Sequence, residues 1–180
     1  MARRSQEHVS AFAELVEARS TALLRLAYAV VGDHQLAQDV LQEALVKVYV
    51  AWPRLRDVSG AEAYARRTIV TTAISWRRRR SFNEPPIEVF PDHEGNDSDH
   101  SDRMATHDVL WEQVRGLPPR QRTALVLRYY EDLSEAQAAD LMGCSTGTVK
   151  SQLSAALAKL RERVGPDTGV LFPKDEAVTR

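Results

Sequence analysis

The sequence contains a single cysteine, Cys144, among its 180 residues. One cysteine cannot form an internal disulfide, and such scarcity is typical of a reducing compartment. Glycine and proline are also scarce, at eight residues each, which excludes collagen-like and low-complexity chains. No uncharged apolar run approaches the roughly 18–20 residues needed to span a bilayer, and the basic start lacks the apolar stretch of a secretion signal. We therefore expect a cytoplasmic protein without membrane insertion.

The net charge of −1 conceals a strong segregation of charge along the chain. Residues 1–80 carry 13 basic and 8 acidic side chains, whereas residues 81–107 carry 1 basic and 7 acidic ones. The remainder, residues 108–180, carries 10 of each. Such asymmetry indicates partners better than the overall charge does.

Apolar residues recur at helical spacing through residues 1–80, and alternating β-branched runs are few. Gly32 and Asp33 predict the end of one helix and the N-cap of the next, which Pro53 ends. A third helix opens at Ser59 and ends in Arg77–Arg80, near the helix end that favours cations. One face of this helix is lined by Tyr64, Ala65, Ile69, Ala73 and Trp76. We therefore predict an all-α bundle over residues 1–80.

The next segment, residues 81–107, is rich in acids, Pro and Gly and is predicted to be a flexible acidic linker. Its His93, His100 and His107 fit no compact metal-ligand spacing, so we interpret them as solvated. Helical periodicity resumes in residues 108–165, breaks at Pro118 and continues into two short helices that end near Gly165. Residues 166–180 form a tail without a clear period.

The sharpest local pattern lies between Leu133 and Leu160. Ser134 and Gln137 have the spacing of a capping box. Ala139, Gly143 and Val149 have the spacing of a helix-turn-helix, in which a small residue allows close approach, Gly allows the turn and Val fills the gap. The second helix would then present its first half to the major groove of DNA. That half contains the candidate DNA contacts Ser145, Thr146, Thr148, Lys150, Ser151 and Gln152. The alternative is a simple helical hairpin.

A second basic and aromatic group lies on the third helix of residues 1–80. Arginines can neutralise phosphates, while aromatic faces stack on unpaired bases. The competing interpretation is a solvated helix end for Arg77–Arg80, with core packing for at least one of Tyr64 and Trp76.

Three segments, in this order, resemble bacterial RNA polymerase sigma factors of the sigma-70 family. Residues 37–45 are similar to the core-binding motif of region two, and residues 61–80 are similar to its promoter-melting segment. Residues 117–122 and 148–153 are similar to region four. The order and spacing match the small extracytoplasmic-function (ECF, group IV) class, which keeps only these two regions.

The resemblance implies two small helical domains, with region two in residues 1–80 and region four in residues 108–165. Its implied partners are core RNA polymerase, through the β′ clamp and the β flap, and promoter DNA, with an anti-sigma factor as a further candidate. The clamp contacts would be Asp39, Gln42 and Glu43, which a helix places within one turn of each other. The minus-ten contacts would be Tyr64, Arg66, Arg67, Thr71, Trp76, Arg77, Arg78, Arg79 and Arg80, and the minus-thirty-five contacts would be the residues from Ser145 to Gln152 named above.

Three positions differ from the pattern of many relatives: Gln38 replaces Glu beside the implied clamp contact, Thr71 replaces Asn, and Ala155 replaces Arg. No nucleophile elbow, phosphate loop or zinc motif is present in the sequence, so we expect neither catalysis nor a cofactor or metal. Two other classes stay open at this point. One is a helix-turn-helix regulator that acts without polymerase, and the other is a helical anti-sigma or adaptor protein.

Overall fold

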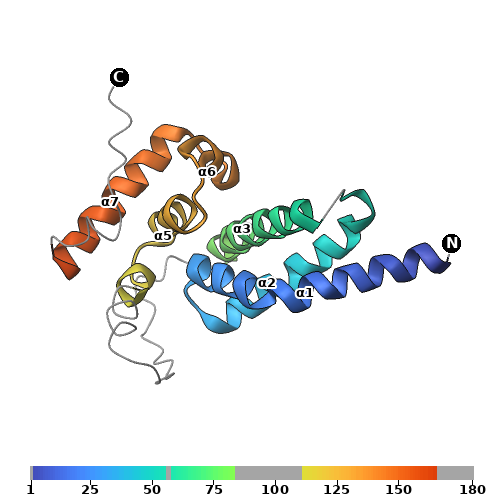
Figure 1. Ribbon diagram of the computed structural model, residues 1–180. Coiled ribbons are helices and arrows are strands. Elements are labelled where there is room, and N and C mark those ends of the chain that lie inside the picture. The colour runs from blue at the N-terminus through green and yellow to red at the C-terminus, as the bar shows by residue number, and fades with distance from the viewer. Residues whose placement is uncertain (1, 56–57, 84–110, 166–180) are drawn as a thin grey trace. The chain divides into compact units, whose positions relative to one another are not determined.

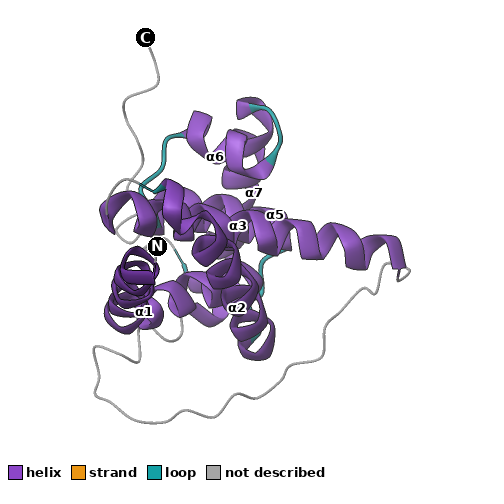
Figure 2. Cartoon of the chain, turned by 90° about the vertical axis from the view of Figure 1, so that its right-hand side faces the viewer, coloured by secondary structure: helices purple, strands orange, loops and turns teal. Residues whose placement is uncertain are grey.

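The computed structural model describes residues 2–55, 58–83 and 111–165. The chain divides into two compact units, one ending at Pro85 and the other beginning at Pro86. Figure 2 shows helices and short loops, with no strand in the described part of the chain, which confirms the all-α prediction. The predicted linker from residue 84 onward, with His93, His100 and His107, and the tail after Gly165 lie outside the described residues. No helix in the described ranges is long and apolar enough to cross a membrane.

The first unit consists of three long helices that all pack against one another (Figure 1). They are α1 (Ala2–Val31), α2 (His34–Ala51) and α3 (Val58–Asn83), with a 3₁₀ turn, η1 (Trp52–Arg54), after α2. Their core side chains include Leu23, Leu26, Val40, Val48, Ile69 and Val70. Because each such side chain contributes roughly 1.5–3 kcal/mol when fully buried, this apolar core is the main source of the unit's stability.

The joint between α1 and α2 confirms the predicted helix boundary. Gly32 adopts a φ of 78°, a backbone conformation that glycine reaches without steric cost. The Asp33 side chain then accepts a hydrogen bond from the Leu36 backbone N–H at 2.8 Å, which caps α2.

Two details of α3 differ from the sequence prediction. The helix begins at Val58 and continues to Asn83, so Arg77–Arg80 lie inside the helix rather than at its end. Tyr64 does not share the face of Ala65, Ile69 and Ala73, which are buried while Tyr64 is exposed. A helix advances about 100° per residue, so neighbours such as Tyr64 and Ala65 cannot face the same side.

The second unit begins its described part with helical residues 111–115 and continues through four elements. These are α5 (Pro119–Leu125), the π-helix η2 (Val126–Tyr130), α6 (Glu135–Met142) and α7 (Thr146–Val164). The core includes Val114, Leu125, Leu127, Val149 and Leu160. The last helix has 19 residues and is therefore not short, although it ends before Gly165 as predicted. The π-helix was not expected from the sequence.

The turn between η2 and α6 is held by hydrogen bonds that cross it. The Leu133 backbone N–H donates to the Leu127 carbonyl at 3.0 Å, and the Arg128 guanidinium donates to the Leu133 carbonyl at 3.1 Å. Asp132, in between, has a φ of 50°. These contacts hold the turn that leads into α6.

Two glycines of the second unit provide a matched test of the turn. Gly143 ends α6 with a φ of 62°, whereas Gly147 lies in the first turn of α7 with room for a Cβ. We expect Gly143→Ala to lower the free energy of unfolding by about 1 kcal/mol, because L residues are strained in the left-handed region. Gly147→Ala should leave it unchanged or raise it by up to about 1 kcal/mol. Urea unfolding followed by circular dichroism measures both, and equal destabilisation would contradict the assignment of the turn.

Candidate nucleic-acid interface

One side of α2 carries mostly exposed residues from its middle to its end. Gln42 is exposed and Asp39 is half-buried one turn before it. The same side continues with Val46 and Val50, whose exposed fractions are 63% and 73%, and with Tyr49. We name these five residues the α2 face. It is polar in its first half and apolar in its second half, and an exposed apolar group of this kind marks an interaction surface.

Glu43, the third predicted clamp contact, is turned toward α3 rather than outward. Its Oε1 accepts a hydrogen bond from Lys47 Nζ at 2.7 Å, and its Oε2 accepts one from the indole N–H of Trp76. The Arg79 guanidinium lies 3.9 Å from Oε1. Lys47 Nζ also donates to the Thr72 hydroxyl at 2.9 Å. These five residues form one connected set of polar contacts, which we name the α2–α3 network.

The environment of Glu43 favours its ionised form. The hydrogen bond from Lys47 is the largest cause that lowers the pKa of the Glu43 carboxyl, and partial burial opposes it. The hydrogen bond from Trp76 and the positive charges of Lys47 and Arg79 lower this pKa further. Glu43 therefore carries its negative charge at neutral pH.

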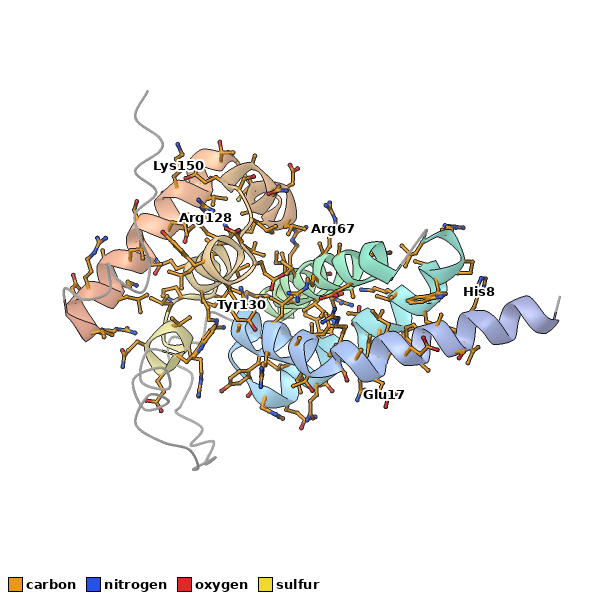
Figure 3. All side chains as sticks on the ribbon, in the orientation of Figure 1. His8, Glu17, Arg67, Arg128, Tyr130 and Lys150 are labelled. Carbon is orange, nitrogen blue, oxygen red and sulfur yellow. The ribbon has the colours of Figure 1, made fainter. Side chains whose placement is uncertain are left out.

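The outer side of α3 carries an exposed row of residues. Tyr64, Arg67, Thr71, Ser75 and Arg78 are all exposed, and their spacing of three or four residues places them on one side of the helix. We name this row the α3 stripe; Figure 3 shows Arg67 pointing outward from it. The Thr71 hydroxyl donates to the Arg67 carbonyl at 3.0 Å, within its own helix. The stripe combines an aromatic ring, cations and hydroxyls, a composition suited to phosphates and unstacked bases.

The other predicted minus-ten residues have contacts inside the unit. Arg66 is 3.1 Å from Glu62, whose other carboxylate oxygen is 3.0 Å from Arg19. Arg77 donates to the Val30 carbonyl at 3.3 Å, in the last turn of α1. Trp76 and Arg79 belong to the α2–α3 network, and the side chain of Arg80 lies outside the described residues. The structure thus divides the predicted minus-ten residues into two groups. One group is exposed on the α3 stripe, and the other makes polar contacts within the first unit.

The helix-turn-helix in the second unit is confirmed by its local geometry. The Ser134 hydroxyl accepts from the Gln137 backbone N–H at 3.2 Å, and the Gln137 side chain accepts from the Ser134 backbone N–H at 2.9 Å. Ala139 and Val149 are buried, and Gly143 adopts the left-handed conformation. The predicted steric roles of these residues are therefore fulfilled.

The first turns of α7 present small polar side chains. Ser145 caps the helix by accepting from the Thr148 backbone N–H at 3.1 Å. Thr146, Lys150 and Ser151 are exposed, while Thr148 and Gln152 are half-buried. Lys150, labelled in Figure 3, lies 3.4 Å from the Glu135 carboxylate at the start of α6. The predicted minus-thirty-five set therefore lies together on one short stretch of helix, with its one cation in an ion pair.

Sequence reasoning missed Lys47, Thr72 and Glu135 as neighbours of the predicted residues. Glu43 and Lys47 are four residues apart on one helix, so their pairing could have been inferred from the sequence. The contacts of Trp76 with Glu43 and of Lys150 with Glu135 join residues of different helices, and no local pattern indicates them.

Taken together, the described residues define a helical protein with a helix-turn-helix in one unit and exposed polar and apolar faces in the other. Residues 15–82 match the family described as Sigma-70 region 2, and residues 107–160 match Sigma-70, region 4. The chain belongs to the sigma-70 family.

Several relatives support this assignment. The RNA polymerase sigma-E factor of Streptomyces avermitilis is 43% identical over 155 residues, which cover 85% of this chain and 84% of that protein. The protein of the same name from Streptomyces coelicolor is 42% identical, covering 85% of each. Other relatives are named ECF RNA polymerase sigma factors, in agreement with the ECF class.

A solved structure shows the same fold. The sigma factor RpoE from Bartonella quintana, in complex with the anti-sigma factor NepR, matches with a TM-score of 0.57 and 21% identity. The match covers 93% of this chain and 99% of that one.

The lowered pKa of Glu43 predicts a pH-dependent contribution to stability. Because its pKa is depressed in the folded protein, the stabilisation is present above the ordinary pKa and is lost as the pH falls through the lowered value. We expect Glu43→Gln to be less stable than the wild type at pH 7, and the difference to shrink as acid neutralises Glu43. Urea unfolding at pH 7 and in steps down to about pH 3, below the ordinary Glu pKa of about 4.3, measures this. A difference that stays constant over this range would contradict it.

Proposed function

We propose that this sigma factor divides its work between the two units. The first unit, assigned to residues 1–80, binds core RNA polymerase through the α2 face and minus-ten DNA through the α3 stripe. The second, assigned to residues 108–165, reads minus-thirty-five duplex DNA through the start of α7. The observation that carries this proposal is the presence, on neighbouring helices of one small bundle, of two different exposed surfaces, one partly apolar and one basic and aromatic.

The two surfaces suit different partners. The apolar second half of the α2 face can be buried against protein, whereas Asp39 and Gln42 supply charge and hydrogen bonds for orientation. The α3 stripe has two cations for phosphates and Tyr64 for stacking, which is what trapping an opened strand requires. The polymerase supplies the chemistry of RNA synthesis, so the sigma factor needs no catalytic group or cofactor and acts in the cytoplasm.

Tethering explains how modest DNA contacts can suffice. Once the first unit is held by polymerase, the second unit searches for its DNA at a high effective concentration, because both belong to one chain. An anti-sigma factor is a further proposed partner, in line with the complex seen for the Bartonella quintana protein. It would act by covering the faces that polymerase and DNA need.

A regulator that acts without polymerase is the second candidate, because the helix-turn-helix alone would serve it equally well. The matches to Sigma-70 region 2 and to Sigma-70, region 4 in one chain favour the sigma factor. Gel shifts with promoter DNA, with and without core polymerase, separate the two. Specific binding of equal strength in both conditions would favour the regulator.

Charge reversal on the α2 face tests polymerase binding. Asp39→Arg should greatly weaken co-purification with core polymerase, because removal of one partner from a close interfacial charge pair costs on the order of 2–5 kcal/mol, and less at the rim. Glu17→Arg, on the exposed side of α1, is the matched control and should bind as the wild type does. Equal retention of both variants would contradict the assignment of the α2 face.

Removal of charge from the α3 stripe tests contact with phosphates. The double substitution Arg67→Ala with Arg78→Ala should weaken polymerase-dependent binding to all promoter sequences. The dependence of the binding constant on salt should fall by roughly one unit of slope for each phosphate that an arginine no longer neutralises. Arg25→Ala, from the exposed side of α1, is the control. An unchanged salt slope in the double variant would exclude these arginines from the DNA interface.

A change in α7 should alter sequence choice instead. Contacts to base edges specify sequence, whereas contacts to phosphates position the protein. We therefore expect Gln152→Ala to change the preferred minus-thirty-five sequence, with about 1–3 kcal/mol of discrimination at the affected base pair. Transcription from a template with a pre-opened bubble should be nearly unchanged. Selection of bound promoters from a randomised library measures the first effect, and an unaltered consensus would contradict it.

A further inference from the structure

The α2–α3 network joins the helix assigned to polymerase with the helix assigned to minus-ten DNA. Both oxygens of Glu43 are engaged inside the protein, one with Lys47 and one with the indole N–H of Trp76. The side chain of Glu43 is about one-third exposed, at 32%. A cation from polymerase would therefore have to compete with two hydrogen bonds and with the nearby Arg79. This geometry sets Glu43 apart from Gln42, which is exposed on the outer side of α2.

The contact engages the one polar group of Trp76. The indole has one polar group, an N–H that can only donate, and Glu43 accepts it. Trp76 is half-buried and follows Ser75 of the α3 stripe, so it lies about 100° around the helix from the stripe. The indole of Trp76 on α3 therefore contacts Glu43 on α2, beside the proposed DNA surface.

Arg79 is held near the same carboxylate. Its side chain is exposed at 62%, and it is flanked by other arginines in the run Arg77–Arg80. Like charges so close together repel one another, and the negative charge of Glu43 offsets part of this repulsion. Neutralising Glu43 would release Arg79 and leave Lys47 without its carboxylate partner.

We propose that Glu43 is a positioning residue for promoter opening: from the polymerase-binding helix, its carboxylate holds Trp76 and Arg79 of the DNA-binding helix in place. This inference rests on the proposed function of the two helices and assigns Glu43 to the geometry of the DNA surface rather than to the polymerase contact. Substitution of Glu43 then impairs DNA opening even when polymerase is already bound.

The direct test of the contact uses the indole N–H signals of the whole chain in a ¹H–¹⁵N correlation spectrum. The sequence has three tryptophans, and Trp76→Phe identifies the signal of Trp76 by its disappearance. In Glu43→Gln that signal should shift, while the signals of Trp52 and Trp111 stay in place and show that the fold is kept. An unmoved Trp76 signal in the folded variant overturns the proposal. Should Glu43→Gln fail to fold, acid titration of the wild type reads the same contact through the same signal.

The functional test compares open-complex formation at saturating core polymerase on duplex and pre-opened templates. Glu43→Gln should keep its affinity for polymerase but form open complexes on duplex DNA about tenfold less well, within the range of coupling measured between contacting residues. Trp76→Phe should show the same defect, and the double variant should be no worse than either single one. Glu17→Gln, on α1, is the matched control for the removal of a carboxylate.

The outcomes separate the positioning role from the proposed function. The positioning role is overturned if Glu43→Gln lowers the affinity for polymerase as much as Asp39→Arg does, and if the defects of Glu43→Gln and Trp76→Phe in open-complex formation add in the double variant. These results would show that Glu43 is a direct polymerase contact. A wild-type chain that supports no promoter-dependent transcription with core polymerase would instead overturn the proposed function. The role of Glu43 in promoter opening would then be overturned as well. The ¹H–¹⁵N spectrum would still report whether Glu43 contacts the indole of Trp76.

Discussion

The burial of α2 and α3 against a common apolar core determines which of their residues stay outside. Val40 and Val48 of α2 and Ile69 and Val70 of α3 are fully buried, so the rotation of each helix about its axis is fixed. Once this rotation is fixed, the α2 face and the α3 stripe must look outward, since each lies away from the buried side. The exposed groups that we propose to bind partners are thus positioned by the buried residues of the same helices.

In the second unit, the steric fit of three residues at one turn fixes how α6 and α7 pack. A left-handed Gly143, a buried Ala139 and a buried Val149 bring α6 and α7 together. Hydrogen-bonded caps at Ser134 and Ser145 mark where each helix begins. The caps satisfy backbone N–H groups at the start of each helix. The outer side of α7 carries small polar residues, which allow another molecule to approach closely.

Much of this architecture could be predicted from local sequence patterns. Asp33, Ser134 and Ser145 are recognisable as caps because capping depends on residues within one turn. The π-helix η2 and the continuation of α3 to Asn83 were not predicted from such patterns. Sequence patterns indicate which residues form the candidate sites, but not which residues of other helices they contact. The contact between Arg77 and the Val30 carbonyl spans 47 positions, and no spacing rule reaches so far.

The ion pair of Lys150 with Glu135 reduces the positive charge at the start of α7. Lys150 is the one cation among residues 145–158, and an acid of α6 already offsets its charge. Under the proposed function, this stretch of α7 attracts phosphates weakly, and its binding depends on short-range fit to the bases. We therefore expect its contacts with DNA to be short-lived once the tether to polymerase is released, so that the chain becomes available to another polymerase.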